Sequence, residues 1–349
     1  MKALLLLGGL GTRMRPFTFE TPKSLLPVCN IPLVWYQFAL LKKYGIDEVV
    51  LGVGYKHLDF KKVLSLGKKM GLKVTLSVEN KTLGTGGGIR NSYKYFSKKD
   101  EPILVFNGDI LADFNLQKIM DFHKDKKASV TIGLIKVSNP ASYGLVITGE
   151  DMGVKRFIEK PSQQEVISDT VNAGVYIFNS PDIIKEIPEN TEISVEKEVF
   201  PLWIEQEKPL FGYTHYGYWL DIGTIESYRK ANFDMLTGKF NPECKLCVNG
   251  SSQKNVLIEG KLAVGKNVYI GEGTVIRGNV VVGDESFVGP NCVLQDTIIL
   301  DSSAIKNNSN IINSVVGKEV YMGEYTRLEN SVLADKSLIH SYTQMGTVK

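Results

Sequence analysis

The sequence is poor in cysteine and histidine. Four cysteines in 349 residues are too few for a disulfide framework. Cys244 and Cys247 have no second pair or histidine close in sequence that would complete a zinc site. The four histidines lie outside every motif described below, so none is assigned a catalytic role. These features exclude a disulfide-rich domain and predict a cytoplasmic location.

Two further absences narrow the class of protein. Lysine and arginine together number 41 against 38 acidic residues, far from the basic excess of a nucleic-acid-binding protein. No apolar run approaches the ~20 residues that span a bilayer. We therefore expect neither nucleic acid nor a membrane among the partners. The chain does have 43% hydrophobic residues, over a length that favours two domains.

The first two thirds of the chain alternate between apolar runs and segments with helical periodicity. Because helices separate the strands, crossover connections and a mixed, mostly parallel sheet of an α/β fold are predicted. Gly45 is expected to end the first helix. The predicted strands are 4–7, 49–53, 74–78, 103–106, 130–137, 175–178 and 210–214, and the predicted helices are 33–44, 87–96, 116–124 and 225–236.

Beyond residue 255 the sequence has a period of six. Three six-residue strands make one triangular coil of a parallel β-helix, in which the repeated aliphatic residue points inward. Lys306 interrupts the row, Ile312 is expected to resume it, and Met322 and Leu328 are expected to form a second register after a phase slip. The aliphatic residues six apart are Ile258, Val264, Ile270, Ile276, Val282, Val288, Leu294 and Leu300.

The strand at 4–7 leads into the loop "GGLGTRMRPFTFETPK", residues 8–23. A Walker phosphate loop is excluded because no Lys-Ser or Lys-Thr pair directly follows Gly11. The dinucleotide fingerprint is a weak match, since Met14 stands where its third glycine would be. Glycines that let the backbone approach phosphate oxygens, with Arg13 and Lys23 as fixed positive charges, suit a triphosphate. Arg15 has two open roles, a phosphate contact or a brace within the loop.

This loop resembles the signature of the sugar-1-phosphate nucleotidylyltransferases, and the resemblance extends over the whole chain. It implies a Rossmann-like, GT-A-like nucleotidyltransferase domain over 1–238, a linker over 239–255, and a left-handed parallel β-helix of hexapeptide repeats over 256–349. Further motifs similar to those of the family are "LGTGGGIR" (83–90), "FNGD" (106–109), "FIEKP" (157–161), "VNAGVYIF" (171–178) and "GYWLDIGT" (217–224).

Two aspartates also have a reading from the residues alone. Asp109 follows the strand at 103–106, at the sheet edge where ligands bind in open α/β folds, although a turn residue would look the same. Asp221 lies within an apolar strand, where an acid is costly unless it is paired or bound to metal. Together with phosphate oxygens, two such carboxylates would hold Mg²⁺.

The resemblance implies a role for each residue that matches a family motif. Arg13 and Lys23 would be catalytic, and Asp109 and Asp221 would bind Mg²⁺. The nucleotide and the sugar phosphate would be bound by a larger set. Nucleotide contacts are implied for Leu7, Gly8, Gly9, Gly11, Thr12, Gly84, Thr85, Gly86, Asn107 and Gly108, and sugar-phosphate contacts for Gly144, Glu159, Lys160, Asn172 and Gly174.

The implied reaction joins an NTP and a sugar 1-phosphate into an NDP-sugar and pyrophosphate. Within the family the chain looks most similar to mannose-1-phosphate guanylyltransferases, which use GTP. Glucose-1-phosphate thymidylyl- and uridylyltransferases are the alternative, as is a regulatory subunit that binds sugar nucleotides without turnover. An acyltransferase is disfavoured because residues 258–317 contain no histidine. A homo-oligomer formed through the β-helix is also expected.

Overall fold

The computed structural model describes residues 1–54, 56–96, 102–242 and 255–346. These residues form two compact units, and each is described by itself. The first consists of Met1–Leu10 and Val34–Asp221, and the second of Gly11–Leu33 and Ile222–Lys349. Most of the expected linker, with Cys244 and Cys247, lies outside the described residues.

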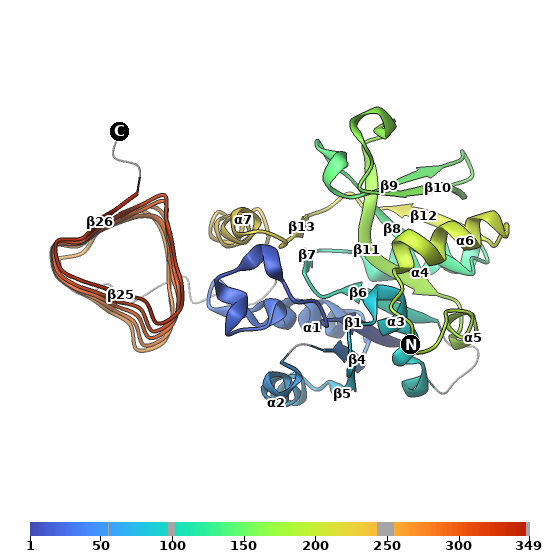
Figure 1. Ribbon diagram of the computed structural model, residues 1–349, viewed down its shortest axis with the longest axis horizontal. Helices are drawn as coiled ribbons and strands as arrows, with labels where there is room; N and C mark the ends of the chain where they lie inside the picture. Colours follow the sequence, from blue (N-terminus) through green and yellow to red (C-terminus); the bar gives the residue numbers. More distant parts are fainter. Residues whose placement is uncertain (55, 97–101, 243–254, 347–349) are drawn as a thin grey trace. The chain divides into compact units, whose positions relative to one another are not determined.

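The first unit is built on a nine-stranded mixed sheet (Figure 1). Its strands follow the order β10-β9-β11-β6-β1-β4-β5, and β8 pairs with both β11 and β12. Strands β5, β4, β1 and β6 are all parallel, whereas β11 runs antiparallel to β6, β8 and β9. The strands are β1 (Lys2–Leu6), β4 (Glu48–Val53), β5 (Lys73–Val78), β6 (Ile103–Asn107), β8 (Val130–Lys136), β9 (Gly144–Thr148), β10 (Val154–Glu159), β11 (Thr170–Phe178) and β12 (Leu210–Thr214).

Helices pack on this sheet and bury its apolar residues. Helix α2 packs on β5, α3 on β1 and β4, and α4 on β8 and β12. The core includes Leu4, Val105 and Tyr176, all fully buried. The helices of the unit are α1 (Leu33–Lys43), α2 (Lys61–Lys69), α3 (Gly84–Asn91), α4 (Leu116–Asp125), α5 (Pro181–Ile184) and α6 (Phe200–Glu205). A π-helix at Val195–Val199 directly precedes α6.

The predicted strands and most helix positions are confirmed, and one helix is shifted. The helix expected over 87–96 begins at Gly84 and ends at Asn91, and a 3-10 turn follows at Tyr93–Tyr95. The glycines of the "LGTGGGIR" segment therefore belong to the helix itself. Two of them donate backbone hydrogen bonds to the Ile193 carbonyl oxygen, at 2.9 Å from Gly86 and 3.3 Å from Gly87. This tertiary contact outweighs the low helix propensity of glycine.

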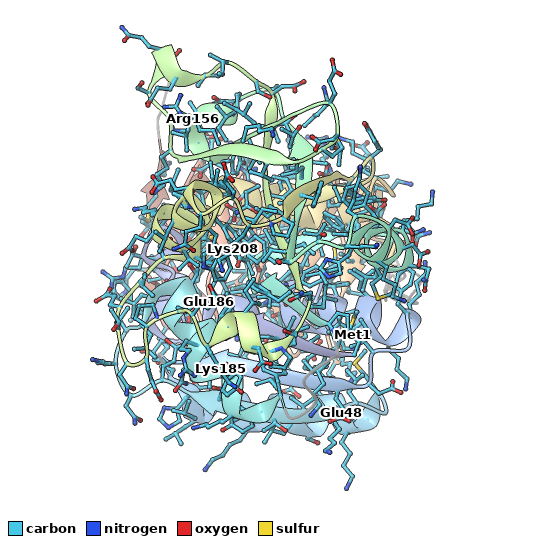
Figure 2. All side chains as sticks on the ribbon, turned by 90° about the vertical axis from the view of Figure 1, so that its right-hand side faces the viewer. Met1, Glu48, Arg156, Lys185, Glu186 and Lys208 are labelled. Atoms are coloured by element: carbon cyan, nitrogen blue, oxygen red, sulfur yellow. The ribbon has the colours of Figure 1, made fainter. Side chains whose placement is uncertain are left out.

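The surface of the first unit carries charges of both signs. Figure 2 shows Lys208 beside Glu186, where Lys208 Nζ lies 2.7 Å from Glu186 Oε2. Glu48, at the start of β4, pairs with Lys2 at 3.3 Å. Such exposed pairs contribute little to stability.

No helix in the described part of the chain is both long and apolar enough to cross a membrane.

The second unit contains helix α7 (Ile225–Leu236) and stacked coils of parallel strands. Viewed end on, the coils are triangular, consistent with a β-helix (Figure 1). Its strands are β14 (Leu257–Val264), β15 (Tyr269–Ile270), β16 (Val275–Val282), β17 (Phe287–Val288), β18 (Val293–Ile299), β19 (Ala304–Ile305), β20 (Asn310–Ile312), β21 (Val315–Val316), β22 (Tyr321–Met322), β23 (Arg327–Glu329), β24 (Val332–Leu333), β25 (Leu338–Ile339) and β26 (Gln344–Met345).

The six-residue row holds through Leu294, but the prediction for residues 300–312 is wrong. Val288 pairs with Ile305, not with Lys306, and the next inward residue is the fully buried Ile311, not Ile312. The register shifts where residues 277–280 pair with 295–297, so a first phase slip, which was not predicted, comes before residue 298. A second slip follows Ile311, close to the predicted position, because the next inward residue is Val316, five positions on. Met322 and Leu328 follow Val316 at six-residue spacing and are fully buried, so the predicted second register is confirmed.

The first residue of the predicted row also departs from expectation. Ile258 is 41% exposed, because it lies on β14, the first strand of its sheet, which pairs on one side with β16 among the described residues. Inside the later coils, buried hydroxyl groups bond to carbonyl oxygens one coil further on. Ser303 Oγ donates to the Gly317 oxygen at 2.8 Å, and Ser309 Oγ to the Gly323 oxygen at 3.1 Å. These buried hydroxyl groups inside the coils thus have hydrogen-bond partners.

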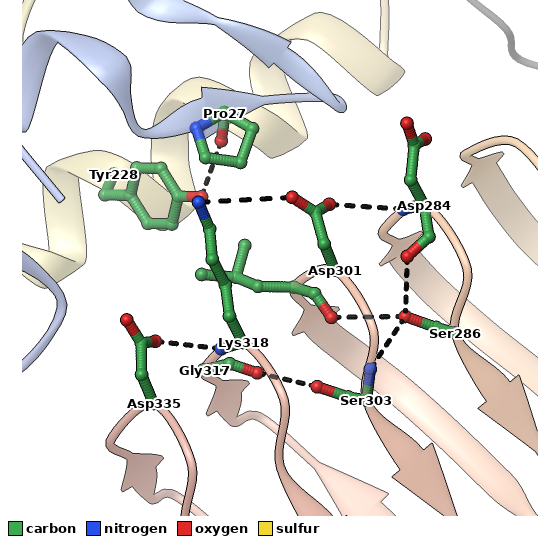
Figure 3. A network of polar contacts seen from close by, with 10 residues as sticks. Pro27, Tyr228, Asp284, Ser286, Asp301, Ser303, Gly317, Lys318 and Asp335 are labelled. Carbon is green, nitrogen blue, oxygen red and sulfur yellow. Dashed lines mark hydrogen bonds and ion pairs between the residues drawn. The ribbon is translucent and has the colours of Figure 1, made fainter. Parts of the chain in front are cut away.

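Within the same unit, α7 joins the loop of residues 11–33 to the coils. Tyr228 Oη donates a 2.5 Å hydrogen bond to the Pro27 carbonyl oxygen, and the Cys29 backbone N–H donates to Asn232 Oδ1 at 2.7 Å. Figure 3 shows Tyr228 beside the loops of the coils, where Lys318 and Asp301 form an ion pair at 4.0 Å. Burial raises the pKa of the Tyr228 hydroxyl far above its ordinary value, so the group stays a donor.

Replacing Tyr228 with phenylalanine is expected to lower the free energy of unfolding by about 1–3 kcal/mol, because the buried Pro27 carbonyl would lose its donor. The measurement is urea denaturation of the full chain. Tyr216→Phe is the control, since Tyr216 is 85% exposed. Equal stability of the two variants would show that this hydrogen bond does not anchor the loop.

Candidate functional site

The parallel strands of the first unit end at one edge of the sheet. The residues that directly follow these ends come from neighbouring strands, so they lie close together. The Leu7 N–H donates to the Gly52 oxygen at 2.7 Å, Glu79 N–H to the Val53 oxygen at 2.8 Å, and Gly108 N–H to the Leu6 oxygen at 2.9 Å. These bonds hold the segments that follow β1, β5 and β6 in fixed register along this edge.

The turn after β6 is stabilised by hydrogen bonds from Gln37 on α1. Gln37 is buried, and its Nε2 donates to the carbonyl oxygens of Asn107 (2.9 Å) and Ile110 (3.2 Å). Gly108 is required by space: a Cβ there would lie 2.0 Å from the Leu7 side chain and 2.6 Å from the Leu6 oxygen. The turn therefore places Asp109 at a fixed point on the edge. No sequence motif pointed to Gln37.

Asp109 and Asp221 are brought to neighbouring strand ends. Strand β7 (Ile110–Ala112) begins directly after Asp109 and pairs antiparallel with β13 (Trp219–Asp221). Asp221 lies opposite Ile110, one residue from Asp109. Although they are 112 positions apart in sequence, the two carboxylates thus share one corner of the first unit.

Glu79 is a site residue that the sequence motifs did not indicate. It follows β5 directly, and its carboxylate faces two glycines of the same edge. A Cβ built on Gly8 would lie 3.2 Å from Glu79 Oε1, and one built on Gly88 would lie 2.9 Å away. Burial raises the pKa of Glu79, and a hydrogen bond from the Leu83 backbone partly opposes this. The rule that singled out Asp109, a carboxylate directly after a parallel strand, would have found Glu79 too.

The residues expected to contact the sugar lie on the antiparallel part of the sheet. Gly144 at the start of β9 pairs with Glu159 at the end of β10. In a continuous strand, the side chains of Glu159 and Lys160 would point to opposite faces of the sheet. Lys160 has a left-handed backbone (φ 51°), so this alternation ends at Lys160. Gly174 also has positive φ (69°), and a Cβ there would lie 2.8 Å from the Asn107 side chain. This region therefore adjoins the turn that carries Asp109.

Glu159 has an acidity set by its surroundings. Burial and the negative charge of Glu196 raise its pKa, while Lys160 and Lys197 act in the opposite direction. Trp219 fixes the neighbouring backbone, since its Nε1 donates to the Ala173 carbonyl oxygen at 2.9 Å.

The expected site residues are divided between the two units. The first unit gathers one group at this sheet edge and the adjoining antiparallel strands, and the second holds the others. The first group is Leu7, Gly8, Gly9, Gly84, Thr85, Gly86, Asn107, Gly108, Asp109, Gly144, Glu159, Lys160, Asn172, Gly174 and Asp221, and the second is Gly11, Thr12, Arg13 and Lys23.

In the second unit the loop residues are placed by short 3-10 turns. Thr12–Met14 forms one such turn, capped by Gly11 with a φ of 61°. Thr18 Oγ1 donates to the Gly11 oxygen at 2.8 Å, and a Cβ on Gly11 would lie 3.3 Å from the Cβ of Lys23. Arg13 is exposed. Arg15 packs within the loop, with its guanidinium 4.8 Å from the centre of the Phe19 ring.

Parallel strand ends that carry glycine turns and carboxylates define an α/β fold of the kind that binds ligands at this edge of the sheet. Residues 2–238 match the family described as nucleotidyl transferase, and residues 258–346 match the GMPPB C-terminal domain. The chain belongs to the nucleotidyl transferase family.

Relatives with known names are similar over most of the chain. One is the mannose-1-phosphate guanylyltransferase catalytic subunit beta of Drosophila pseudoobscura pseudoobscura, 37% identical over 97% of this chain and 89% of the relative. Another is the mannose-1-phosphate guanyltransferase of Schizosaccharomyces pombe, 34% identical over 100% of this chain and 95% of the relative. The mannose-1-phosphate guanylyltransferase of Mycobacterium tuberculosis is 34% identical over 78% of this chain and 77% of the relative.

A solved structure supports the fold. HddC from Yersinia pseudotuberculosis is 27% identical and superposes with a TM-score of 0.58, covering 66% of this chain and 97% of that chain. A crystal structure of HddC complexed with GMP-PN gives a TM-score of 0.57 over the same shares of the two chains.

Proposed function

We propose that the chain transfers GMP from GTP to mannose 1-phosphate, which gives GDP-mannose and pyrophosphate. The observation that carries this proposal is similarity over nearly the whole chain to relatives named as mannose-1-phosphate guanylyltransferases. A sugar-phosphate oxygen attacks the α-phosphorus of GTP, and the bond between that phosphorus and the bridging oxygen of the leaving pyrophosphate breaks. Because the attacking phosphate is already ionised, the reaction needs no general base.

Glu79 supports guanine as the base. An ionised carboxylate only accepts hydrogen bonds, and its two oxygens match the adjacent N1–H and N2–H₂ donors of guanine. Uracil and thymine instead present one N–H between two acceptors. Glu79 lies beside Gly8 and Gly88, whose missing side chains leave the carboxylate accessible to a base. We therefore assign Glu79 to base selection, with Gly84, Thr85 and Gly86 bordering the base on α3.

The phosphates would be held by charge and by backbone N–H groups. Leu7, Gly8, Gly9, Gly11 and Thr12 would place N–H groups around the triphosphate. Arg13 would stabilise the leaving pyrophosphate, Lys23 the α-phosphate and Lys160 the attacking phosphate. Gly144, Glu159, Asn172 and Gly174 would hold the hexose, with Asn107 and Gly108 at the junction between sugar and nucleotide.

Asp109 and Asp221 fit Mg²⁺. They offer two hard carboxylate oxygen donors, because Asp221 ends β13 and Asp109 directly precedes β7, the strand paired with it. Mg²⁺ binds proteins through one or two carboxylates plus substrate phosphates. Among the described residues, no group of three or more His, Cys, Asp or Glu side chains could hold a metal ion. In this proposal, phosphate oxygens complete the coordination. A bound Mg²⁺ would neutralise charge on the phosphates and polarise the reacting phosphoryl group.

The wider organisation is part of the same proposal. We place the catalytic domain at 1–238, a linker at 239–255 and a left-handed β-helix of hexapeptide repeats at 256–349. The family matches over 2–238 and 258–346 support that division. We also propose a cytoplasmic location and a homo-oligomer formed through the β-helix.

The direct test is release of pyrophosphate. The full chain is incubated with Mg²⁺, each of GTP, ATP, UTP, CTP and dTTP, and each of several hexose 1-phosphates. We expect the fastest release with GTP and mannose 1-phosphate. Faster release with dTTP or UTP and glucose 1-phosphate would replace the proposed specificity, and no release with any pair would remove the enzymatic proposal.

Glu79→Gln is expected to weaken the preference for GTP over dTTP. A glutamine presents one donor and one acceptor, so it loses one bond to guanine and gains a match to thymine. The ratio of kcat/KM for GTP to that for dTTP should fall about 10- to 100-fold, the discrimination that one bidentate pair provides. Glu150→Gln is the control, because Glu150 is exposed in the turn between β9 and β10. An unchanged ratio would place base recognition elsewhere.

A further inference from the structure

A buried carboxylate connects the two sides of the proposed site. Glu196 lies in the π-helix at Val195–Val199 and is 8% exposed. Three hydroxyl groups donate to it: Thr85 Oγ1 to Oε2 at 2.5 Å, Ser194 Oγ to Oε2 at 2.7 Å, and Tyr176 Oη to Oε1 at 3.0 Å. A buried carboxylate is tolerated when it is satisfied in this way. One-turn π-helices often occur at functional sites.

The charge of Glu196 fixes the direction of the hydrogen bonds on the sugar side. An ionised carboxylate can only accept, so the Tyr176 hydroxyl must donate to it. The oxygen of Tyr176 is then left to accept from Asn172 Nδ2, at 2.8 Å. Asn172 Oδ1 in turn accepts from the Gly174 N–H at 2.9 Å. The relay leaves the Asn172 amide only one orientation.

The same carboxylate orders the nucleotide side. The Thr85 hydroxyl donates to Glu196, so it accepts from the Val195 N–H, at 3.0 Å. One residue further on, the Gly86 N–H donates to the Ile193 oxygen at 2.9 Å. The first turn of α3 is thus held by the segment that carries Glu196.

Glu159 interacts electrostatically with this network. The negative charge of Glu196 is one cause of the raised pKa of Glu159, second to burial. The network therefore adjoins both Asn172 and Glu159, the residues assigned to the hexose.

We propose that Glu196 is a positioning residue for the sugar 1-phosphate: through Tyr176 it sets which atoms of the Asn172 amide face the hexose. This inference rests on the proposed function of the site. Glu196 acts through other side chains and is not assigned a contact with substrate. Its removal should therefore weaken the productive orientation of the hexose phosphate more than it affects GTP.

Glu196→Gln separates the two sides of the network. The glutamine oxygen can still accept from Thr85 and Ser194, so the nucleotide side is preserved. Its Nε2 would donate to Tyr176, which would then have to donate to Asn172 and compete with the Gly174 N–H. We expect KM for mannose 1-phosphate to rise about tenfold, the effect of one lost hydrogen bond, while KM for GTP changes less than about threefold.

Two further variants make the test specific. Tyr176→Phe cuts the relay between Glu196 and Asn172, and should raise KM for the sugar phosphate similarly. The double variant should show no further rise, because both changes break one relay. Glu198→Gln is the control: Glu198 is exposed in the same π-helix, and its Oε1 accepts from the Ser194 N–H at 3.0 Å, a bond that glutamine keeps.

The outcomes distinguish this inference from the proposed function. If the wild-type protein uses another nucleotide and sugar phosphate, the proposed function is corrected. The positioning role is then tested by the same KM comparison with that pair. A rise in KM for the sugar phosphate alone supports the positioning role. An unchanged KM, an equal rise in both KM values, or additive effects of Glu196→Gln and Tyr176→Phe would overturn it.

Discussion

Asp109→Asn and Asp221→Asn are each expected to reduce the rate of nucleotidyl transfer by at least about 100-fold, because a metal ion at a phosphoryl group supplies several kcal/mol of charge stabilisation. Strand pairing places Asp221 opposite Ile110, one residue after Asp109, so either substitution removes one of two negative charges at the same corner. The Mg²⁺ concentration at half-maximal activity should rise in both variants. Pyrophosphate release measured across a Mg²⁺ titration gives both quantities.

Asp113→Asn is the matched control for this pair. Asp113 follows β7 directly, and its Oδ1 lies 2.9 Å from His215 Nε2, a contact that an asparagine oxygen can keep. The control should show nearly unchanged activity and Mg²⁺ dependence. If Asp109→Asn and Asp221→Asn keep the normal Mg²⁺ dependence, other groups hold the metal.

The elements of the first unit were predictable because local patterns and tertiary packing agree there. The apolar runs that became β1, β4, β5 and β6 are flanked by helices, and parallel pairing follows from that order. Asp109 could be proposed because it follows such a strand. The start of α3 was missed because glycines disfavour helix locally, and the bonds that stabilise them come from Ile193, more than 100 residues later.

The supporting side chains of the candidate site lie beyond what sequence patterns indicate. Glu196 meets Thr85 across 111 residues and Tyr176 across 20, and neither spacing is a motif. Gln37 likewise reaches the turn at Asn107 across 70 residues. Such contacts depend on the folded topology. Known motifs in a single sequence therefore indicate residues expected to contact a ligand more readily than the residues that position those side chains.

The stacked coils of the second unit show how a sequence period can be right and its phase wrong. The row from Val264 to Leu294 points inward as predicted, because each coil keeps three six-residue sides. The shift between residues 277–280 and 295–297 shortens the later coils, so Val288 pairs with Ile305, 17 positions on, whereas Ile270 pairs with Val288, 18 positions on. In the sequence this appears only as an interruption at Lys306, because Leu300 still fits the old phase and is buried.

Arg13→Ala is expected to reduce kcat by on the order of 100-fold or more, the usual cost of removing one group that stabilises developing transition-state charge. Arg13 lies in the Thr12–Met14 turn, is exposed, and follows the Gly11 cap that sets the loop conformation. As pyrophosphate leaves, negative charge grows on the β-phosphate, and a positively charged guanidinium beside it would stabilise that charge. Single-turnover release of pyrophosphate from GTP measures this chemical step.

Arg15→Ala provides the comparison within the same loop. It removes the same charge two residues away, but Arg15 packs against the Phe19 ring at 4.8 Å, so its loss should act on the loop and not on the leaving group. We expect Arg15→Ala to lower kcat less than about tenfold, since an exposed cation–π contact is worth about 0.5–1 kcal/mol. Equal losses in the two variants would mean that the charge of the loop as a whole matters, and near-normal turnover of Arg13→Ala would remove Arg13 from the catalytic residues.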